Sequence, residues 1–481
     1  MARDVFKKQY VFSSCRLALP TMQEHSVGKA YLYTHPALRV QTLTAKSGKQ
    51  VTILGNAFCT DAAPKTIQDD VAVWDGKSLL ALTQYWTGRW VLLTENELIT
   101  DAGGLMAAFY KAEQNRFTVS SSLAVMATLL EVTSMNVCSQ RGLNWHLLPA
   151  SGIDGVSKLC CTQRLIFENG TAMPAPYLWP ENFTELSTEE KSRQMAHMLI
   201  NACRNMAIDK NQPLMLALTG GKDSRLVLAA LIRSGISFET YTFAYPNISS
   251  ADKSLPQKMS RAAGVMHRYI KRGTFHANKQ EGYLQFSFGD SNGLDAVFYA
   301  HDQFDQIPKN TMVIRSGLFE AGQTYGRTVA AGSPEGFEDG MRQYYADALA
   351  DKAQSTAFDA WLRLTRDNPI PFIDIRDRFY IEQRVGGWAA AIEQSLDIND
   401  FTSIQIANCP KLLSLLLSAT AEERKEAKVS MESIKQLHPE LLRYPVNKKT
   451  VVDTLHFIFD VLKSPKKRLR NFINSHLRKQ L

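Results

Sequence analysis

Cysteine is scarce in this chain, and its spacing excludes two common kinds of cysteine-rich protein. The 481 residues include 7 cysteines, none of which form a C-x-x-C pair, and Cys160 and Cys161 are adjacent. Disulfide-stabilised secreted domains and zinc-binding modules both need regularly spaced cysteines. We therefore expect reduced thiols rather than a disulfide framework or a zinc site.

Long apolar runs are also missing. No stretch reaches the ~20 apolar residues of a membrane-spanning helix, and Arg16 interrupts the first apolar stretch too early for a signal peptide. Internal repeats and low-complexity tracts do not stand out either. These observations predict a cytoplasmic protein that has no membrane partner.

Negative charge is in the minority. The chain carries 55 Lys and Arg residues against 47 Asp and Glu residues, a net charge of +8 at pH 7. That balance suits nucleotides, acidic substrates or nucleic acid, but it is modest for a chain of this length. With 45% apolar residues the chain can bury a large core, and its length predicts two domains.

The most informative stretch is an apolar run followed by two glycines. Residues 214–218 predict a short buried strand, and Gly220 and Gly221 predict a tight turn in which both residues can take positive φ. Residues 224–232 then predict a helix that Gly235 caps. The first N–H groups of a helix are unpaired and carry about half a positive charge, so this turn predicts an anion site.

The residues from Thr219 to Ser224 (TGGKDS) resemble the S-G-G-x-D-S pyrophosphate loop of the ATP pyrophosphatase family, with Thr for the first Ser. Enzymes of that family cleave ATP between its α- and β-phosphates, adenylate a substrate oxygen and release pyrophosphate. The resemblance implies ATP and Mg²⁺ as cofactors, with Asp223 as a metal ligand. It implies nucleotide contacts from Leu218, Thr219, Gly220, Gly221, Lys222, Asp223, Ser224 and Arg225. A purely structural turn is the alternative.

Residues 1–182 predict a layered α+β domain. Short apolar runs between Gly, Asp and Asn turns predict strands, and two apolar patches predict helices; these are residues 30–33, 38–43, 50–55 and 90–94 for strands and 79–85 and 122–130 for helices. The order of these pieces resembles the glutaminase-type (Ntn-type) N-terminal domain of asparagine synthetases. The resemblance is carried by Gly55, by Thr87-Gly-Arg-Trp90 and by Ile99-Thr-Asp-Ala-Gly-Gly104.

The nucleophile of such a glutaminase is missing from its expected place. The family uses a cysteine at the start of the chain, whose own α-amine acts as the base for the thiol. Here the chain begins Met1-Ala2-Arg3-Asp4, and its first cysteine is Cys15 in a strand-like run. Because free cysteine behaves as a small hydrophobic residue, we expect Cys15 in the core. The domain is therefore expected to be a glutaminase scaffold without glutaminase chemistry.

Residues 183–481 predict a Rossmann-like ATP pyrophosphatase domain that has a parallel sheet and a helical C-terminal part. Strands at 238–243, 267–271 and 311–315 alternate with helices, as in a doubly wound sheet that binds its ligand at the carboxyl ends of the strands. The family places the residue that ends the second strand beside adenine, which implies Phe243. His267 matches a common Gly-x-x-His of the family and is expected to be structural.

A second glycine turn follows the strand at 311–315. Relatives read Ser-Gly-x-Gly-x-Asp-Glu here, and this chain keeps only Ser316, Gly317 and an acid, Glu320. The partial match implies that Ser316 and Gly317 contact the nucleotide and that Glu320 shares the Mg²⁺ with Asp223. The alternative is that Glu320 is an ordinary solvated carboxylate.

From residue 337 onward the pattern predicts helices. At 3.6 residues per turn Phe379, Glu382 and Val385 share one face, as do Tyr380 and Arg384. The resemblance implies that this segment borders the acceptor pocket, with Glu382 as an acid/base or orienting carboxylate and Tyr380 as a second catalytic candidate. The alternative for Glu382, which the sequence supports equally, is a structural ion pair with an arginine.

The late segment Pro445-Val-Asn-Lys448 resembles the place where the family positions a lysine near the reacting groups. The resemblance implies that Lys448 stabilises the charge that develops during adenylation, with Lys449 as the fallback. A solvated surface lysine is the alternative for either residue.

The resemblance to asparagine-synthetase-like proteins extends from the Thr87 region to about Lys449. Members that lack the N-terminal cysteine include β-lactam synthetase and lasso-peptide cyclases, in which a substrate amine attacks the adenylated carboxylate. A tethered amine can have an effective molarity of about 10⁵–10⁸ M, so free ammonia becomes unnecessary. We therefore expect an ATP-dependent amide ligase or cyclase that acts, without glutamine hydrolysis, on a small molecule or peptide with a carboxylate and an amine.

Two other classes of protein stay open. An RNA-modifying adenylating enzyme is compatible with the net charge of +8, but the glutaminase-like front domain argues against it, so nucleic acid is not the expected partner. A catalytically silent ATP-binding scaffold would explain the missing cysteine and the incomplete second loop. The oligomeric state is not predicted.

Overall fold

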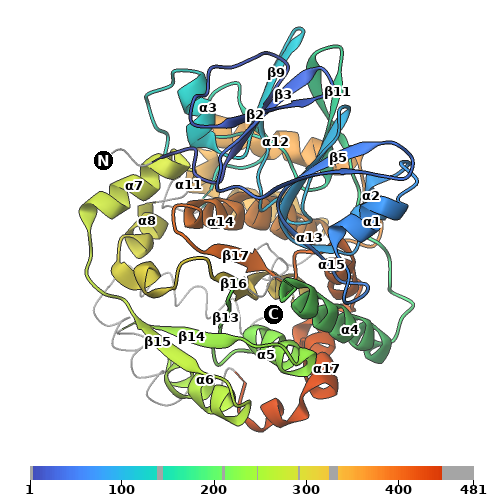
Figure 1. Cartoon of the computed structure of the whole chain (residues 1–481), viewed down its shortest axis with the longest axis vertical. Helices are drawn as coiled ribbons and strands as arrows, with labels where there is room; N and C mark the ends of the chain where they lie inside the picture. Colours follow the sequence, from blue (N-terminus) through green and yellow to red (C-terminus); the bar gives the residue numbers. More distant parts are fainter. Residues whose placement is uncertain are drawn as a thin grey trace.

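The computed structural model describes residues 4–137, 143, 145–208, 212–245, 248–290, 293–323 and 334–446. Within these residues the chain forms two six-stranded antiparallel sheets, between residues 10 and 176, and one five-stranded parallel sheet, between residues 214 and 405. The antiparallel sheets lie above the parallel sheet in Figure 1. The predicted combination of a layered α+β part and a parallel α/β part is confirmed at this level.

The two antiparallel sheets pack face to face. The first has the order β10-β8-β9-β1-β3-β2 and the second the order β12-β11-β7-β6-β5-β4. Phe117 and Phe167, one from each sheet, stack with their ring centroids 4.7 Å apart. All the predicted strands of this part are present. The strands are β1 (Tyr10–Ser13), β2 (Gln23–Val27), β3 (Ala30–Thr34), β4 (Val40–Thr44), β5 (Gln50–Cys59), β6 (Trp86–Leu93), β7 (Glu97–Thr100), β8 (Phe109–Glu113), β9 (Arg116–Ser120), β10 (Ser157–Lys158), β11 (Gln163–Glu168) and β12 (Thr171–Pro176).

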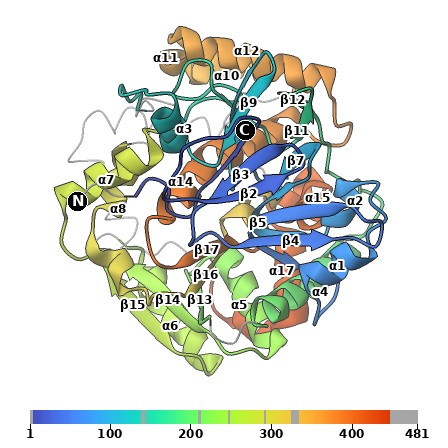
Figure 2. The same ribbon diagram turned by 45° about the horizontal axis from the view of Figure 1, so that its top comes forward.

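Short helices cover the outer faces of this pair of sheets. Helix α1 (Ile67–Val73) contacts β4 and β5, and α2 (Leu79–Thr83) lies beside them, as Figure 2 shows. Helix α3 (Leu123–Leu129) contacts β9 of the first sheet. The patches predicted at 79–85 and 122–130 are therefore helical, which confirms the layered arrangement of this part.

The parallel sheet has the strand order β15-β14-β13-β16-β17. Its strands are β13 (Leu214–Ala217), β14 (Glu239–Ala244), β15 (His267–Lys271), β16 (Met312–Arg315) and β17 (Thr402–Gln405). From β13 the chain builds outward to β15 on one side and then crosses to β16 on the other. The order therefore reverses between β13 and β16, which is the switch point where open α/β sheets bind ligands.

Helices cover both faces of the parallel sheet. Leu214, Leu216 and Ile314 face α4 (Thr188–Met206), α5 (Lys222–Ser234) and α17 (Lys428–Leu437), whereas Met215 and Val313 face the opposite layer. The other helical elements are α6 (Ser250–Ala262), α7 (Ala277–Ser287), α8 (Gly293–Tyr299), η1 (Asp302–Gln306), η2 (Gly317–Gly322), α10 (Phe337–Tyr344), α11 (Ala346–Leu349), α12 (Lys352–Asp367), α13 (Ile375–Phe379), η3 (Tyr380–Ala389), α14 (Ala390–Leu396), α15 (Pro410–Leu417), α16 (Ala421–Lys425) and η4 (Pro439–Arg443).

Three local predictions need correction. The region after residue 337 is not wholly helical, because Thr402–Gln405 forms β17 beside β16; four residues of mixed polarity are too short to give a strand pattern. The segment Tyr380–Ala389 is a π-helix, so the predicted 3.6-residue faces do not apply to it. Cys15, expected in the core, is half-buried in a bend after β1.

Polar contacts and one apolar core join the two parts of the chain. Asn408 donates to the Gly88 carbonyl at 2.6 Å and accepts from the Gly103 N–H at 2.7 Å, and Thr87 donates to the Ile406 carbonyl at 2.6 Å. A single core includes Trp86 from β6 and side chains of α4 and α15. The domain division at residues 182 and 183 therefore stays a prediction. In the described parts of the chain, no helix has both the length and the apolar character that a membrane span requires.

Candidate functional site

The two glycine turns predicted from the sequence lie next to each other. Strands β13 and β16 are hydrogen-bonded neighbours, with Leu216 opposite Ile314. The Thr219 turn follows the carboxyl end of β13, and the Ser316 turn follows the carboxyl end of β16. Both turns therefore leave the sheet at its switch point, where a ligand would contact both.

Two hydroxyl groups close the first turn. The backbone N–H of Thr219 donates to Ser224 Oγ at 3.0 Å, and the two hydroxyls lie 3.0 Å apart. The Gly221 N–H also approaches Thr219 Oγ1 at 3.3 Å. The turn is thus shaped by the polar side chains that the sequence offered as phosphate donors.

A glycine is needed at position 220 because Ala251 lies close to it, and not because the backbone there has positive φ. Neither Gly220 nor Gly221 has positive φ, and φ of Gly221 is −74°, which corrects the predicted reason for the two glycines. A Cβ atom on Gly220 would lie 3.1 Å from Cβ of Ala251 in α6. The Gly220 N–H donates to Asp252 Oδ1 at 2.6 Å, so the turn is fastened to the start of α6.

The amino end of α5 presents N–H donors that have no side-chain cap within the part of the chain that the structure describes. Gly221 is the N-cap of this 13-residue helix, and it has no side chain that could accept from the first N–H groups. Nζ of Lys222 lies 3.0 Å from Oδ1 of Asp223, but that oxygen is buried and has no partner with hydrogen-bond geometry. Free N–H donors, an ammonium and a carboxylate oxygen are groups that fit a polyphosphate and its Mg²⁺.

Two of the predicted nucleotide contacts lie behind the loop. Arg225 is fully buried, and its guanidinium donates to four backbone carbonyls, which are those of Gly220 (3.0 Å), Leu441 (3.1 Å), Tyr444 (2.6 Å) and Pro445 (2.9 Å). Burial without a carboxylate partner lowers the pKa of this guanidinium. Leu218 uses its N–H for the Tyr241 carbonyl and its own carbonyl for the Thr242 hydroxyl. Both residues position the loop.

The second turn brings together two residues predicted separately. The Gly317 N–H donates to Gln405 Oε1 at 2.9 Å, which anchors the start of η2 to β17. Glu320 is exposed on η2, and the hydroxyl of Tyr380 donates to its Oε2 at 3.0 Å. The predicted metal ligand and the predicted catalytic tyrosine are thus in contact beside the glycine turns.

The sequence analysis missed a buried acid, Glu393, at the same edge of the sheet. Its side chain is 1% exposed, and Oε1 accepts from Arg315 at 2.7 Å and from Gln405 at 2.8 Å. Arg315 and Gln405 are the last residues of β16 and β17, so this carboxylate lies near the carboxyl ends. Among the described residues, Oε2 has no hydrogen-bond partner. The signal available in the sequence was a single acid directly after the apolar run from Trp388 to Ile392.

Phe243 and His267 lie on the β14 side of the sheet. Phe243 is half-buried near the end of β14, within an aromatic cluster that includes Tyr245, stacked at 5.8 Å, and Phe298, edge-on at 6.1 Å. Burial lowers the pKa of His267 to about 4, so its ring is neutral at pH 7, and Nδ1 lies 2.9 Å from the Thr240 hydroxyl. That geometry suits the structural role expected for His267.

Glu382 has the surroundings of a structural ion pair. It is fully buried on η3, accepts from Trp361 Nε1 at 2.6 Å and from Arg378 Nε at 2.8 Å, and also bonds the Thr162 hydroxyl. These donors occupy both of its oxygens. The structure therefore favours the Arg–Glu pair over a carboxylate that meets substrate.

Lys448 and Lys449 lie outside the described residues. Pro445, three positions before Lys448, is bonded through its carbonyl to Arg225. The assignment of a catalytic lysine stays a prediction.

Comparisons with known proteins give little further guidance. No protein-family model matches the chain, and no curated protein matches its sequence. Among solved structures, the glutamine phosphoribosylpyrophosphate amidotransferase from B. subtilis, in complex with ADP and GMP, is 8% identical over 63% of this chain and 93% of its own, with a TM-score of 0.22. A structure described as the allosteric regulatory enzyme of purine biosynthesis is 8% identical over 59% of this chain and 72% of its own, with a TM-score of 0.23. Scores this low carry no argument, so the conclusions on function rest on the site.

Proposed function

We propose that this protein is an ATP-dependent, AMP- and pyrophosphate-forming ligase or cyclase that joins a substrate carboxylate to a substrate amine. The observation that carries the proposal is the amino end of α5, which lacks a side-chain cap and lies at the switch point of the parallel sheet. The hydroxyl-closed Thr219 turn and the Asp223 carboxylate, which is ion-paired with Lys222, support it. The cytoplasmic location belongs to the same proposal.

The proposed reaction has two steps. A carboxylate oxygen of the substrate attacks the α-phosphorus of ATP, the bond from that phosphorus to the oxygen bridging to the β-phosphate breaks, and pyrophosphate leaves. The substrate amine then attacks the activated carbonyl carbon, loses one proton and displaces AMP. Mg²⁺, when bound, supplies charge neutralisation at the phosphates.

Each residue of the site has a role in this proposal. The N–H groups at the start of α5, with Thr219, Ser224 and Lys222, bind the leaving pyrophosphate. Asp223 and Glu320 hold Mg²⁺, and Tyr380 orients Glu320 through their hydrogen bond of 3.0 Å. Oε2 of Glu393 is buried near the carboxyl ends of β16 and β17 and has no hydrogen-bond partner among the described residues. It is our candidate to bind the amine or take its proton.

The direct test follows the products of ATP. The full chain is incubated with α-labelled ATP, MgCl₂ and a panel of compounds that contain both a carboxylate and an amine. We expect AMP and pyrophosphate in equal amounts, with at least one compound and only when Mg²⁺ is present. Steady formation of ADP and phosphate would contradict the proposal. Absence of ATP binding in calorimetry would favour the silent scaffold, and salt-sensitive tRNA binding would favour an RNA-modifying enzyme.

Lys448→Ala should act on rate and not on nucleotide binding. Adenylation places extra negative charge on the α-phosphate and the attacked oxygen, and a lysine beside both stabilises that charge more than it stabilises bound substrate. We expect kcat to fall by about 10²–10³, the usual effect of losing one such donor, while ATP binding stays within about twofold. Weaker ATP binding with unchanged kcat would make Lys448 a ground-state contact. An inactive Lys449→Ala beside a normal Lys448→Ala would transfer the role to Lys449.

Glutamine should not serve as a nitrogen source. Cys59, Cys160, Cys161, Cys203 and Cys409 are buried, and burial raises the pKa of each of these thiols, so none presents a thiolate to a substrate. Cys15 is half-buried in a bend, and we expect Cys15→Ser to keep full activity. Cys138 lies outside the described residues. Glutamate release from glutamine that depends on this protein would overturn the prediction, whichever cysteine supports it.

A further inference from the structure

A cavity of about 440 Å³ lies between the two parts of the chain, away from the candidate nucleotide site. On one side it is lined by residues of the antiparallel part, among them Arg39, Asn56 and Arg89. On the other side it is lined by Thr402 and Ser403, which begin β17. The cavity thus opens at the amino ends of the parallel strands, whereas the glycine turns lie at their carboxyl ends.

Positive charge is in excess around this cavity. Its charged lining residues are Lys8, Arg39 and Arg89 against a single acid, Asp397. Arg89 and Asp397 form a buried pair, with Nη1 2.7 and 2.8 Å from the two carboxylate oxygens. Lys8 lies beside that pair, but its ammonium donates to the carbonyls of Asn399 and Phe401, which carry no charge. Within the described ranges, Lys8 and Arg39 therefore have no carboxylate partner of their own.

Several polar groups of the lining have hydrogen-bonding capacity left. Lys8 uses two of its three N–H donors, and burial lowers the pKa of its ammonium. Among the described residues, nothing accepts a hydrogen bond from the guanidinium of Arg39 or from Nη2 of Arg89. Ser403 is 7% exposed, and its Oγ is buried without a partner. Buried polar groups are normally satisfied, so the Ser403 hydroxyl indicates a missing partner, whereas Arg39 is exposed and contributes an accessible positive charge.

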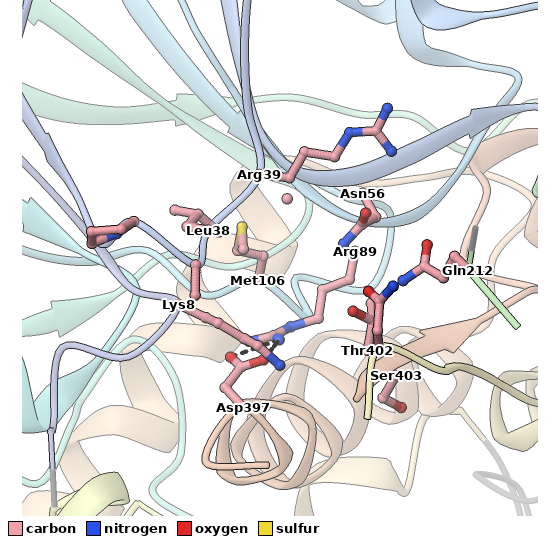
Figure 3. Close-up of a pocket in the computed structure, with 14 residues that line it drawn as sticks. Lys8, Leu38, Arg39, Asn56, Arg89, Met106, Gln212, Asp397, Thr402 and Ser403 are labelled. Carbon is pink, nitrogen blue, oxygen red and sulfur yellow. Dashed lines mark hydrogen bonds and ion pairs between the residues drawn. The ribbon is translucent and has the colours of Figure 1, made fainter. Parts of the chain in front are cut away.

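Arg39 and Asp397 lie at opposite sides of the cavity (Figure 3). A ligand bound between them could contact the Arg39 side chain without breaking the ion pair between Arg89 and Asp397. The cavity volume lies within the ~300–1,000 Å³ that small-molecule sites occupy. An acidic group would neutralise the unpaired cations and accept from the free donors, which a neutral ligand cannot do.

We propose that this cavity binds a small molecule through a carboxylate or phosphate group, at a site separate from the nucleotide. Lys8, Arg39 and the Nη2 amino group of Arg89 bind the acidic group, and Ser403 and Asn56 complete the polar lining. This inference rests on the cavity alone and is independent of the proposed ligase activity.

The test is calorimetric titration of the full chain with sodium malonate and, separately, with inorganic phosphate, at constant ionic strength. We expect saturable 1:1 binding of at least one of them. Preference for malonate would identify a carboxylate ligand, and preference for phosphate a phosphorylated one. Arg39 is exposed on its strand connection, so Arg39→Gln should fold normally and weaken binding by about tenfold or more, the effect of losing a charged hydrogen bond.

Arg116→Gln is the matched control, because Arg116 is equally exposed at the start of β9 and outside the cavity. It should bind the anions as the unmodified chain does. Binding that survives Arg39→Gln lies elsewhere, for instance at the start of α5, and would overturn the proposal. Absence of saturable binding by either anion would overturn it as well.

Discussion

Asp223→Asn should reduce pyrophosphate release from ATP by about 10³-fold. In the proposed site this carboxylate binds the Mg²⁺ that neutralises the phosphates, a contribution of several kcal/mol, and each ~1.4 kcal/mol of barrier is a factor of ten. Asparagine keeps the shape of the side chain and removes its charge. The loss should appear in kcat, measured as pyrophosphate formed at saturating ATP and MgCl₂.

The same substitution should leave the fold intact. The Asp223 side chain is 21% exposed, and its charged contact is with its neighbour Lys222. Partly exposed ion pairs of this kind contribute about 0–1 kcal/mol to stability, so the melting temperature should change little. Asp75→Asn is the control, because Asp75 is an exposed carboxylate of the antiparallel part. Normal turnover of Asp223→Asn with Mg²⁺ would show that the metal assignment is wrong.

Glu382→Leu should lower the free energy of unfolding by about 3–5 kcal/mol, the usual cost of breaking a buried ion pair by removing one partner. Arg378 would stay charged and buried without its carboxylate, and Trp361 Nε1 would lose its acceptor. Denaturant unfolding followed by tryptophan fluorescence measures the change. The folded fraction should keep its turnover if the role of Glu382 is structural.

The double variant Arg378→Leu/Glu382→Leu separates the cost of an unpaired charge from the cost of lost packing. Replacing both partners of a buried pair by apolar residues is often close to neutral, so the double variant should be more stable than Glu382→Leu. A Glu382→Leu protein as stable as the unmodified chain, but without turnover, would instead restore Glu382 as a catalytic candidate.

The nucleotide loop could be predicted because the residues that determine its structure are adjacent in the sequence. The strand, the two glycines and the helix that Gly235 ends lie within 22 residues of sequence, and the structure places each of them as expected. The same is true of the turn after β16. The reason for Gly220 could not be predicted, because it depends on Ala251 in a different helix.

The acceptor side of the site depends on contacts between distant segments. The Tyr380–Glu320 bond joins residues 60 positions apart, and Glu393 meets Gln405 only because β17 completes the sheet. A short strand of mixed polarity gives no period-two pattern, so neither the strand nor the network could be read from the sequence. The π-helix at Tyr380–Ala389 likewise breaks the 3.6-residue spacing on which the prediction for Glu382 was based.

The bond from Asn408 to the Gly88 carbonyl joins residues 320 positions apart in the chain. This separation determines how long Gly88 must wait for its partner while the chain is being synthesised. At about 5–20 residues per second, a ribosome needs roughly 16–64 s to make the residues between them. During that interval the face of β6 that carries Trp86 has not yet met α15, which packs against it in the finished protein. The part of this apolar face that α15 covers is therefore exposed for tens of seconds. Cells that make this protein are expected to need a chaperone on its first half until α15 has been synthesised.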